Sequence, residues 1–271
     1  MTAMAGNTPQ AAVEGLRVSG LNTRLRGRPI LEALSLPQLS PGSLVGLLGP
    51  NGSGKSTLLK SLAGLVPSSC AGLSLAGRDL RALNASDRAE YIRYLPQTLP
   101  GDIHLTVIGS MQVALRARRP LDRRDELPAI VNALEELGIA HLANRYLDEL
   151  SGGQKQLVGL AQAVCREPDV LLLDEPLASL DLNHQHHVMQ MLGQLTRERK
   201  LLTLIVLHDL NNVLRYCDQA LLMRGGKLVG SGAPDAVITE QSLAATFSIR
   251  ARLETSSQGL PYVLVDGRLP D

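Results

Sequence analysis

The fold is decided by one stretch of the chain, Gly49-Pro50-Asn51-Gly52-Ser53-Gly54-Lys55-Ser56-Thr57. It matches the pattern G-x-x-x-x-G-K-[ST], which binds phosphate where it lies between a strand and a helix. The apolar run Leu44–Leu48 ends directly before it and predicts a buried strand. From Ser56 to Leu65 the leucines recur at helical spacing. The sequence therefore predicts a strand, a phosphate-binding loop and a helix, in that order.

The residue types in this loop suit a triphosphate. Glycines let the backbone wrap closely around a ligand, and successive N–H groups and the helix dipole then supply positive field. Lys55 is expected to reach the β- and γ-phosphates, and the Ser56 hydroxyl is expected to ligate magnesium. A glycine-rich turn that matches by chance is the alternative, but strand, loop and helix all agree with phosphate binding.

A second apolar strand ends in two carboxylates. Val170–Leu173 is followed directly by Asp174 and Glu175. An acidic strand end could be accidental, but beside a phosphate-binding loop it has a chemical use. Asp174 is predicted to support the magnesium ion, and Glu175 is the candidate base that orients and polarises the attacking water.

A third element is Leu150-Ser151-Gly152-Gly153-Gln154, just before an apolar helix. Ser151 and Gln154 form a capping-box pattern, which accounts for the serine but not for two adjacent glycines. A helix N-terminus with bare backbone also binds phosphate. One chain would then carry two phosphate-binding ends, which suggests two copies that each offer one half of a shared nucleotide site.

Short apolar runs and helical patterns alternate along the rest of the chain. Strands are expected at Leu73–Ala76, Ile92–Leu95, Leu202–Leu207 and Ala220–Met223. From Thr106 to Cys165 the apolar residues recur at helical spacing, and an exposed turn is expected at Arg116–Arg124. Two apolar helix faces are predicted, one with Leu127, Ile130, Val131, Leu134 and Leu137 and one with Leu157, Leu160, Ala161 and Val164. A helix is expected before Leu202, and one of its faces would carry Val188, Met191, Leu192 and Leu195. After Gly232, short helices and a hairpin around Gln258-Gly259 are expected. This alternation predicts a parallel sheet with right-handed crossovers and a helical insertion.

Composition excludes several classes of protein. The 271 residues include 27 Lys+Arg and 26 Asp+Glu, so the chain lacks the excess of positive charge that binding of duplex nucleic acid requires. Aromatic residues make up 2%, fewer than base-stacking proteins need. The three distant cysteines predict free thiols. The start has no secretory pattern, and no apolar run approaches the roughly 20 residues of a membrane-spanning helix. If the protein works at a membrane, another chain supplies the membrane part.

Together these motifs resemble those of the ATP-binding subunit of ATP-binding-cassette (ABC) transporters. Gly49–Thr57 is similar to the Walker A motif, Val170–Glu175 to the Walker B motif, and Leu150–Gln154 to the family signature. Gln97 resembles the Q-loop glutamine, Ser179-Leu180-Asp181 the D-loop, and His208 the switch histidine. The six motifs follow the family's order and cover nearly the whole chain.

The resemblance implies an α/β fold, a P-loop NTPase cassette with a mostly parallel sheet core, a β-rich N-terminal part and a helical subdomain that carries the signature. After a loose tail at residues 1–12, the ATPase domain would span 13–271. Within it, 13–100 and 166–248 would form the core with the N-terminal β part, 101–165 the helical subdomain, and 249–271 a short C-terminal extension.

The resemblance also implies ATP with magnesium, and a head-to-tail homodimer. Each ATP would lie between Gly49–Thr57 of one copy and Ser151, Gly152, Gly153 and Gln154 of the other. Gln97 would sense the magnesium and the attacking water, His208 would contact the γ-phosphate, and Asp181 would communicate across the dimer. The partners would be integral membrane permease subunits and, indirectly, a substrate-binding protein, with no nucleic acid. The chain would then lie peripherally on the cytoplasmic face of the inner membrane.

Segments in the second half of the chain resemble one subfamily of these transporters. Ser179–Gln185, Leu207–Asn211, Arg215–Asp218 and Gly230–Pro234 resemble importers of iron–siderophore complexes, haem and cobalamin, without choosing among these cargoes. The alternative is a soluble cassette ATPase that acts on nucleic acid, ribosomes or cluster assembly. A single Walker A motif, balanced charge and no long heptad run favour the transporter.

Three features depart from the family pattern or lie outside it. Leu25 or a neighbouring arginine stands where most cassettes have an aromatic residue stacked on adenine. Gln156-Leu157 and Ala161-Gln162 stand where arginines are usual, with no functional account. His184, His186 and His187 suggest a metal site, but two imidazoles on one helix face lack a third ligand, which favours a structural or dimer-contact role.

Overall fold

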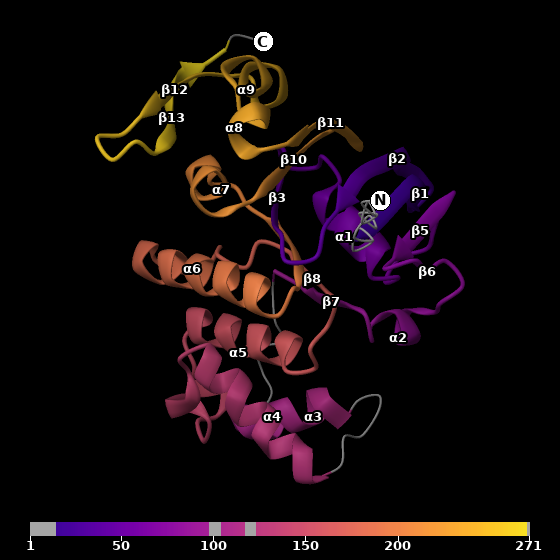
Figure 1. Cartoon of the computed structure of the whole chain (residues 1–271), viewed down its shortest axis with the longest axis vertical. Coiled ribbons are helices and arrows are strands. Elements are labelled where there is room, and N and C mark those ends of the chain that lie inside the picture. The colour runs from indigo at the N-terminus through magenta and orange to yellow at the C-terminus, as the bar shows by residue number, and fades with distance from the viewer. Residues whose placement is uncertain (1–14, 98–103, 117–122, 270–271) are drawn as a thin grey trace, which may run out of the picture.

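The centre of the molecule is a six-stranded sheet in the order β11-β10-β3-β9-β8-β7 (Figure 1). The structure is a computed structural model that describes residues 15–97, 104–116 and 123–269. The strands are β3 (Leu44–Leu48), β7 (Ile92–Leu95), β8 (Val170–Leu173), β9 (Leu202–Val206), β10 (Gln219–Arg224) and β11 (Lys227–Gly232). All neighbours from β10 to β7 pair in parallel, as predicted, and β11 adds an antiparallel edge.

Burial explains which central strands could be predicted. Every residue of β3, β8 and β9 is buried, and a strand covered on both faces shows as a continuous apolar run. In the edge strand β11, exposed and half-buried residues alternate, so no apolar run marks it. The sequence did not predict β11 for that reason.

A second, antiparallel sheet is formed by the N-terminal part in the order β2-β1-β5-β6, with β4 beside β1. Its strands are β1 (Leu16–Leu25), β2 (Arg28–Leu39), β4 (Ser68–Ser69), β5 (Gly72–Leu75) and β6 (Arg78–Asp79). The long pair β1–β2 contains several register shifts, which interrupt the alternation of apolar residues that marks a strand. The resemblance implied a β-rich N-terminal part, but the sequence pattern did not predict β1 and β2; the strand expected at Leu73–Ala76 corresponds to β5.

Helix α1 (Lys55–Leu62) follows the phosphate-binding loop, and its Leu58, Leu59 and Leu62 are fully buried. The prediction that the helix continues to Leu65 is wrong. Gly64 has a left-handed φ of 74° and ends the helix, so Leu65 lies beyond it and is 53% exposed.

The helical lobe consists of α3 (Val107–Arg116), α4 (Arg123–Glu136), α5 (Gly152–Val164) and 3₁₀ turns at Ala140–Leu142 and Leu147–Glu149. In α4, Ile130 is buried together with Leu134, and Leu137 follows the helix, but Leu127 and Val131 are 51% and 37% exposed. The prediction of one buried face is wrong for those two. At 100° per residue the five side chains span about 120° of the helix, and only part of that arc meets α3 and α5. Most of the predicted turn at Arg116–Arg124, residues 117–122, lies outside the described residues.

The remaining elements cover the central sheet and end the chain. They are α2 (Ala85–Arg88), α6 (Leu182–Glu198), α7 (Leu210–Tyr216), α8 (Pro234–Val237), α9 (Glu240–Phe247), β12 (Ile249–Thr255) and β13 (Pro261–Arg268). The predicted hairpin around Gln258-Gly259 is confirmed as β12–β13, which lies beside α8 and α9 (Figure 1). Within the described ranges, none of the helices combines the length and apolarity needed to cross a bilayer.

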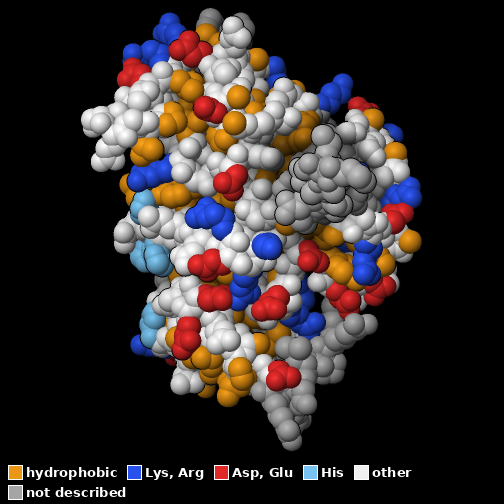
Figure 2. Space-filling view, in the orientation of Figure 1, with side chains coloured by type: hydrophobic (Ala, Val, Ile, Leu, Met, Phe, Trp, Pro, Cys, Tyr) orange, Lys and Arg blue, Asp and Glu red, His pale blue; other side chains and the backbone are white. Residues whose placement is uncertain are grey.

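All three cysteines are free, as predicted. Burial raises the pKa of Cys165 to about 11 and that of Cys217 to about 12, so neither thiol ionises readily at neutral pH. On the face drawn in Figure 2, basic and acidic side chains are interspersed, in keeping with the net charge of +1.

A buried hydroxyl pair joins the N-terminal sheet to helix α1, which follows the phosphate-binding loop. Thr23 of β1 and Ser61 of α1 are both 1% exposed, and their hydroxyl oxygens lie 2.8 Å apart. Ser61 Oγ also donates to the carbonyl of Thr57, 2.8 Å away, inside the first turns of α1. These bonds fix α1, and with it the loop, against the N-terminal sheet.

We predict that Ser61→Ala lowers the free energy of unfolding by about 1–3 kcal/mol, because the hydroxyl of Thr23 is left buried without its partner. The measurement is chemical denaturation of both single variants and of the Thr23→Val/Ser61→Ala double variant. The double variant should lose less stability than the two single variants combined. Strictly additive losses would show that the two hydroxyls do not interact.

Candidate active site

The candidate catalytic residues follow the carboxyl ends of four parallel strands. Gly49–Thr57 follows β3, Gln97 follows β7, Asp174 and Glu175 follow β8, and His208 follows β9. Since β7, β8, β9 and β3 are neighbours in the sheet, their carboxyl ends lie along one edge. The fold thus gathers residues that lie as far as 159 positions apart between Gly49 and His208.

The phosphate-binding loop needs glycine at its first position. Gly49 has φ of 148°, and a Cβ there would lie 2.2 Å from the carbonyl oxygen of Met223. At the other end of the loop, Lys55 Nζ donates to the carbonyls of Gly49 and Pro50 at 2.7 and 3.0 Å. Burial lowers the pKa of the Lys55 ammonium, and the carboxylates of Glu175 and Asp174 oppose that shift. The ammonium is therefore held inside the curve of the loop.

Two further observations fit a bound triphosphate. Gly54 caps α1 without any side-chain hydrogen bond, so the N–H groups of the first turn remain directed out of the helix. Ser53 Oγ is buried, and within the described ranges it has no hydrogen-bond partner. An unsatisfied buried hydroxyl beside bare helical N–H groups suits an anionic oxygen ligand.

Ser56 and Asp174, which are both predicted to bind magnesium, lie side by side, and Ser56 Oγ donates to Asp174 Oδ1 at 2.9 Å. The second carboxylate oxygen of Asp174 accepts from the hydroxyl of Tyr94, also at 2.9 Å. Burial, with the charge of Asp174 next, raises the pKa of Tyr94, which keeps this hydroxyl protonated as a donor. Hydroxyl and carboxylate oxygens are the ligands magnesium prefers, so this pair fits the ion.

Glu175 is held from both neighbouring strands. Gln97 Nε2 donates to its Oε2 at 2.8 Å, and His208 Nε2 lies 2.7 Å from its Oε1. The structure therefore brings the three predicted catalytic residues together. It places the Gln97 amide on Glu175 rather than on the Ser56–Asp174 pair, and a metal-binding role for Gln97 stays a prediction. A cavity of about 130 Å³ lies beside this cluster, lined by Glu175, Leu207 and His208 among others.

Sequence reasoning missed Tyr94. It lies in β7, which runs parallel to β8 with Tyr94 paired to Leu172, two residues before Asp174. A polar aromatic residue near the carboxyl end of a strand was the available signal. It becomes meaningful only once β7 is known to be the neighbour of β8.

The signature residues lie on the helical lobe, at the start of α5. Ser151 Oγ accepts from the Gln154 N–H at 3.3 Å, and Gln154 Oε1 accepts from the Ser151 N–H at 3.0 Å, so the capping box is formed. Gly153 also has a packing reason, since a Cβ there would lie 2.7 Å from Leu180 Cδ2. This contact seats the signature on the Ser179–Asp181 segment.

Asp181 caps the N-terminus of α6. Its carboxylate accepts from the His184 N–H at 2.8 Å and pairs with the His184 ring at 2.8 Å. The backbone bond, with the ring contact next, lowers the pKa of Asp181. His186 bonds the Tyr216 hydroxyl instead. Across the described ranges, no group of three His, Cys, Asp or Glu residues is arranged to hold a metal ion.

Strand β2 lies next to the phosphate-binding loop, a few residues from the tip of the β1–β2 hairpin. A Cβ on Gly54 would lie 2.9 Å from the Leu31 side chain of β2, and Leu25 ends β1 opposite Arg28. Leu25 is 36% exposed. An aliphatic side chain and arginines, with no aromatic residue, therefore occupy this tip.

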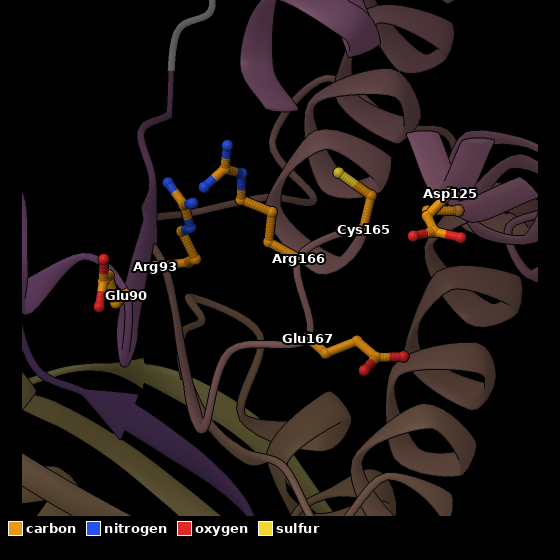
Figure 3. A pocket seen from close by; sticks show the side chains of 7 residues that line it. Glu90, Arg93, Asp125, Cys165, Arg166 and Glu167 are labelled. Carbon is orange, nitrogen blue, oxygen red and sulfur yellow. The ribbon is translucent and has the colours of Figure 1, made fainter. Parts of the chain in front are cut away.

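A separate cavity of about 370 Å³ lies at the amino ends of β7 and β8, beside α4 (Figure 3). Arg93 and Arg166 extend side by side along it, while Asp125 and Glu167 lie toward the other side. It separates part of the helical lobe from the sheet, at the end opposite the catalytic residues.

Comparison with known proteins agrees with this geometry. A family model described as ABC transporter matches residues 31–178. The chain is 33% identical to the hemin import ATP-binding protein HmuV of Rhizobium meliloti, covering 92% of this chain and 97% of that protein. It is 33% identical to the ferric enterobactin transport ATP-binding protein FepC of Escherichia coli K12, covering 85% and 87%. It is 36% identical to the cobalamin import ATP-binding protein BtuD of Halobacterium salinarum, and spans 60% of the length of that relative.

Solved structures share the fold. CbiO1 of Clostridium perfringens, part of the ABC transporter complex cbiONQ, superposes with a TM-score of 0.76 at 27% identity, covering 86% of this chain and 93% of that chain. A nucleotide-free ATP-binding cassette from an ABC transporter gives a TM-score of 0.72 at 23% identity, covering 87% and 95%. The second likeness concerns the fold alone.

We predict that Tyr94→Phe weakens magnesium-dependent nucleotide binding by roughly three- to ten-fold, because Asp174 loses the donor that orients it. The measurement is a magnesium titration at fixed ATP, read as bound nucleotide. Tyr91→Phe is the matched control, since Tyr91 immediately precedes the same strand and bonds Arg78 instead. Equal effects of the two variants would contradict the orienting role of Tyr94.

Proposed function

The chain belongs to the ABC transporter family, and from that premise we propose that it is the ATP-hydrolysing subunit of an importer. The cargo is an iron complex (haem or a ferric siderophore) or cobalamin, which passes through a partner transmembrane permease. The observation that carries the proposal is Glu175, whose carboxylate is held by Gln97 and His208 within the same strand edge as Lys55. Hemin import, cobalamin import and ferric enterobactin transport, which are the functions of these relatives, support the direction of transport and the class of cargo.

The chemistry follows from the positions of the side chains. Lys55 and the loop N–H groups bind the phosphates, and Glu175 accepts a proton from the attacking water. Each oxygen of Glu175 has one partner, and a carboxylate oxygen can accept a second hydrogen bond, so water can reach Glu175 while both contacts are in place. His208 is the partner that exchanges Glu175 for the γ-phosphate. Bound magnesium, held by Ser56 and Asp174, would neutralise part of the phosphate charge.

A second copy of the chain supplies the signature. Ser151 and Gly152 are exposed on the helical lobe, where bare N–H groups at the start of α5 suit the phosphates bound by another copy. Leu182, directly after Asp181, is 82% exposed, which suits burial in the same interface. We therefore propose a head-to-tail homodimer on the cytoplasmic face of the plasma membrane, with a substrate-binding protein on the other side.

The helical lobe offers the surface for the permease. Val113 of α3 is 59% exposed, and Leu127 and Val131 of α4 are also exposed. Figure 2 shows hydrophobic side chains gathered over this lobe at the lower end of the molecule. Arg116 is a poor probe of this surface, because its guanidinium bonds both carboxylate oxygens of Glu126, which is 3% exposed, and charge reversal would disturb the lobe itself.

Glu175→Gln is the decisive test of the enzymatic proposal. The change keeps size and hydrogen-bonding capacity but removes the base, so ATP hydrolysis should fall by about 10²–10⁴-fold. ATP binding should survive because Lys55 and Ser56 are untouched, and the dimer should accumulate with ATP bound. Size-exclusion chromatography with ATP and magnesium measures the dimer, and a phosphate-release assay measures the rate.

Lys55→Ala is the matched control, since it should lose nucleotide binding and transport while the chain stays folded. A Glu175→Gln variant that hydrolyses ATP near the wild-type rate would show that another residue is the base.

The competing proposal, a soluble cassette acting on nucleic acid or ribosomes, predicts a nuclease-sensitive complex. The transporter predicts co-purification with a co-expressed integral membrane subunit.

We predict that Val113→Asp lowers coupled transport roughly ten-fold while the basal ATP hydrolysis of the isolated chain stays within about two-fold. A charge on an exposed position costs little in the free chain but is desolvated in an interface. Val229→Asp, at a valine 52% exposed on β11, is the control and should leave transport unchanged. Equal losses of transport and basal hydrolysis would show that Val113 is needed for the ATPase fold itself and not for contact with the permease.

A further inference from the structure

The C-terminal hairpin is tied to α7 by one side chain. Val263 of β13 pairs with Leu253 across the hairpin, and its outward N–H and C=O both face Asn211. The Val263 N–H donates to Asn211 Oδ1 at 2.7 Å, and Asn211 Nδ2 donates to the Val263 carbonyl at 3.5 Å. The amide of Asn211 thus takes the place of one residue of a third strand at this sheet edge.

The same asparagine lies three residues after His208. The Asn211 N–H donates to Asp209 Oδ1 at 2.8 Å, which caps α7 and fixes the backbone between the two residues. His208 in turn contacts Glu175 at 2.7 Å. Val263 is therefore connected to Glu175 through its bonds to Asn211, the cap that Asp209 places on α7, and the contact of the adjacent His208 with Glu175.

The hairpin is a firm support rather than a loose tail. Val263 and Ala251 are 7% and 4% exposed and belong to the same hydrophobic core cluster as Val213 of α7. Helix α9 packs against β12 and α7 packs against β13. The outer face has its own bonds, since Arg252 pairs with Asp266 and Tyr262 donates to Glu254.

From this geometry we infer that Asn211 is a positioning residue for His208, and that the C-terminal hairpin is the support against which it acts. The inference rests on the proposed ATPase function. Displacement of the first turn of α7 moves the His208 backbone directly, and a catalytic contact loses much of its effect with misplacement on the order of 1 Å. The β12–β13 hairpin then acts on the catalytic site only through the bonds between Val263 and Asn211.

The test compares Asn211→Ala with Tyr262→Phe in the full-length chain. Tyr262→Phe removes a hydrogen bond within the same hairpin but leaves the link to α7 intact. Asn211→Ala should lower kcat for ATP hydrolysis by about ten-fold, with KM for ATP within about two-fold, because the loop and Lys55 are untouched. Tyr262→Phe should leave both constants unchanged.

Two further readouts separate positioning from loss of stability. The ¹⁵N resonance of His208 Nε2 should shift in Asn211→Ala toward its position in Glu175→Ala, where the contact is absent, and should not move in Tyr262→Phe. Asn211→Asp keeps the acceptor for the Val263 N–H and should recover part of the lost kcat. An unmoved His208 resonance, an unchanged kcat, or equal losses in kcat for Asn211→Ala and Asn211→Asp would overturn the inference. Wild-type protein without any ATP hydrolysis would instead refute the proposed function.

Discussion

The carboxylate of Glu175 is the point on which the catalytic edge depends, because side chains from both neighbouring strands converge on it. Strand β8 lies between β7 and β9, so Gln97 and His208 approach Glu175 from opposite sides. This convergence requires parallel strands, since only then do all three carboxyl ends lie together. The next strand along, β3, delivers Lys55 and Ser56 to the same edge, and Ser56 reaches Asp174 beside Glu175. The order of the strands in the sheet therefore brings four separate segments of the chain together into one site.

The backbone at this point is also constrained. Glu175 has a left-handed φ of 51°, a conformation that typically costs a non-glycine residue about 1–3 kcal/mol and that clusters at functional sites. A hydrogen bond from Gln97 and the 2.7 Å contact with His208 hold its side chain, and the Ala178 N–H donates to its carbonyl at 3.3 Å. The turn redirects the chain toward Leu180, which packs against Gly153 of the signature. Catalytic carboxylate and signature are thereby joined through five residues of chain.

Local sequence signals predicted the elements that are buried on both faces or that carry a motif. Strand β3, the loop after it and strand β8 are of this kind. The C-terminal hairpin is mostly exposed and was predicted from its Gln258-Gly259 turn, and the predicted face of α6 included the half-buried Met191 but not the fully buried Met189. The errors lie where burial is one-sided. Leu65 follows a helix that a glycine ends early, Leu127 and Val131 sit at the margin of a buried arc, and β11 is a half-exposed edge. For α4 and β11 the neighbouring element, which the local pattern does not contain, decides the outcome, whereas for Leu65 the adjacent Gly64 does.

The same limit applies to the site, and it shows what kind of residue a motif leaves out. Tyr94 bonds Asp174 from 80 positions away, and Asn211 bonds Val263 from 52 positions away. Neither contact can be read from spacing, because each depends on which strands or helices become neighbours. The motif residues are the ones proposed to contact the nucleotide or the reacting water, whereas Tyr94 bonds the motif residue Asp174 and Asn211 bonds the hairpin beside α7. Since hydrogen bonds weaken steeply with distance and angle, such residues control catalysis through geometry. Variation at these supporting positions can therefore change activity in a chain whose six motifs are intact.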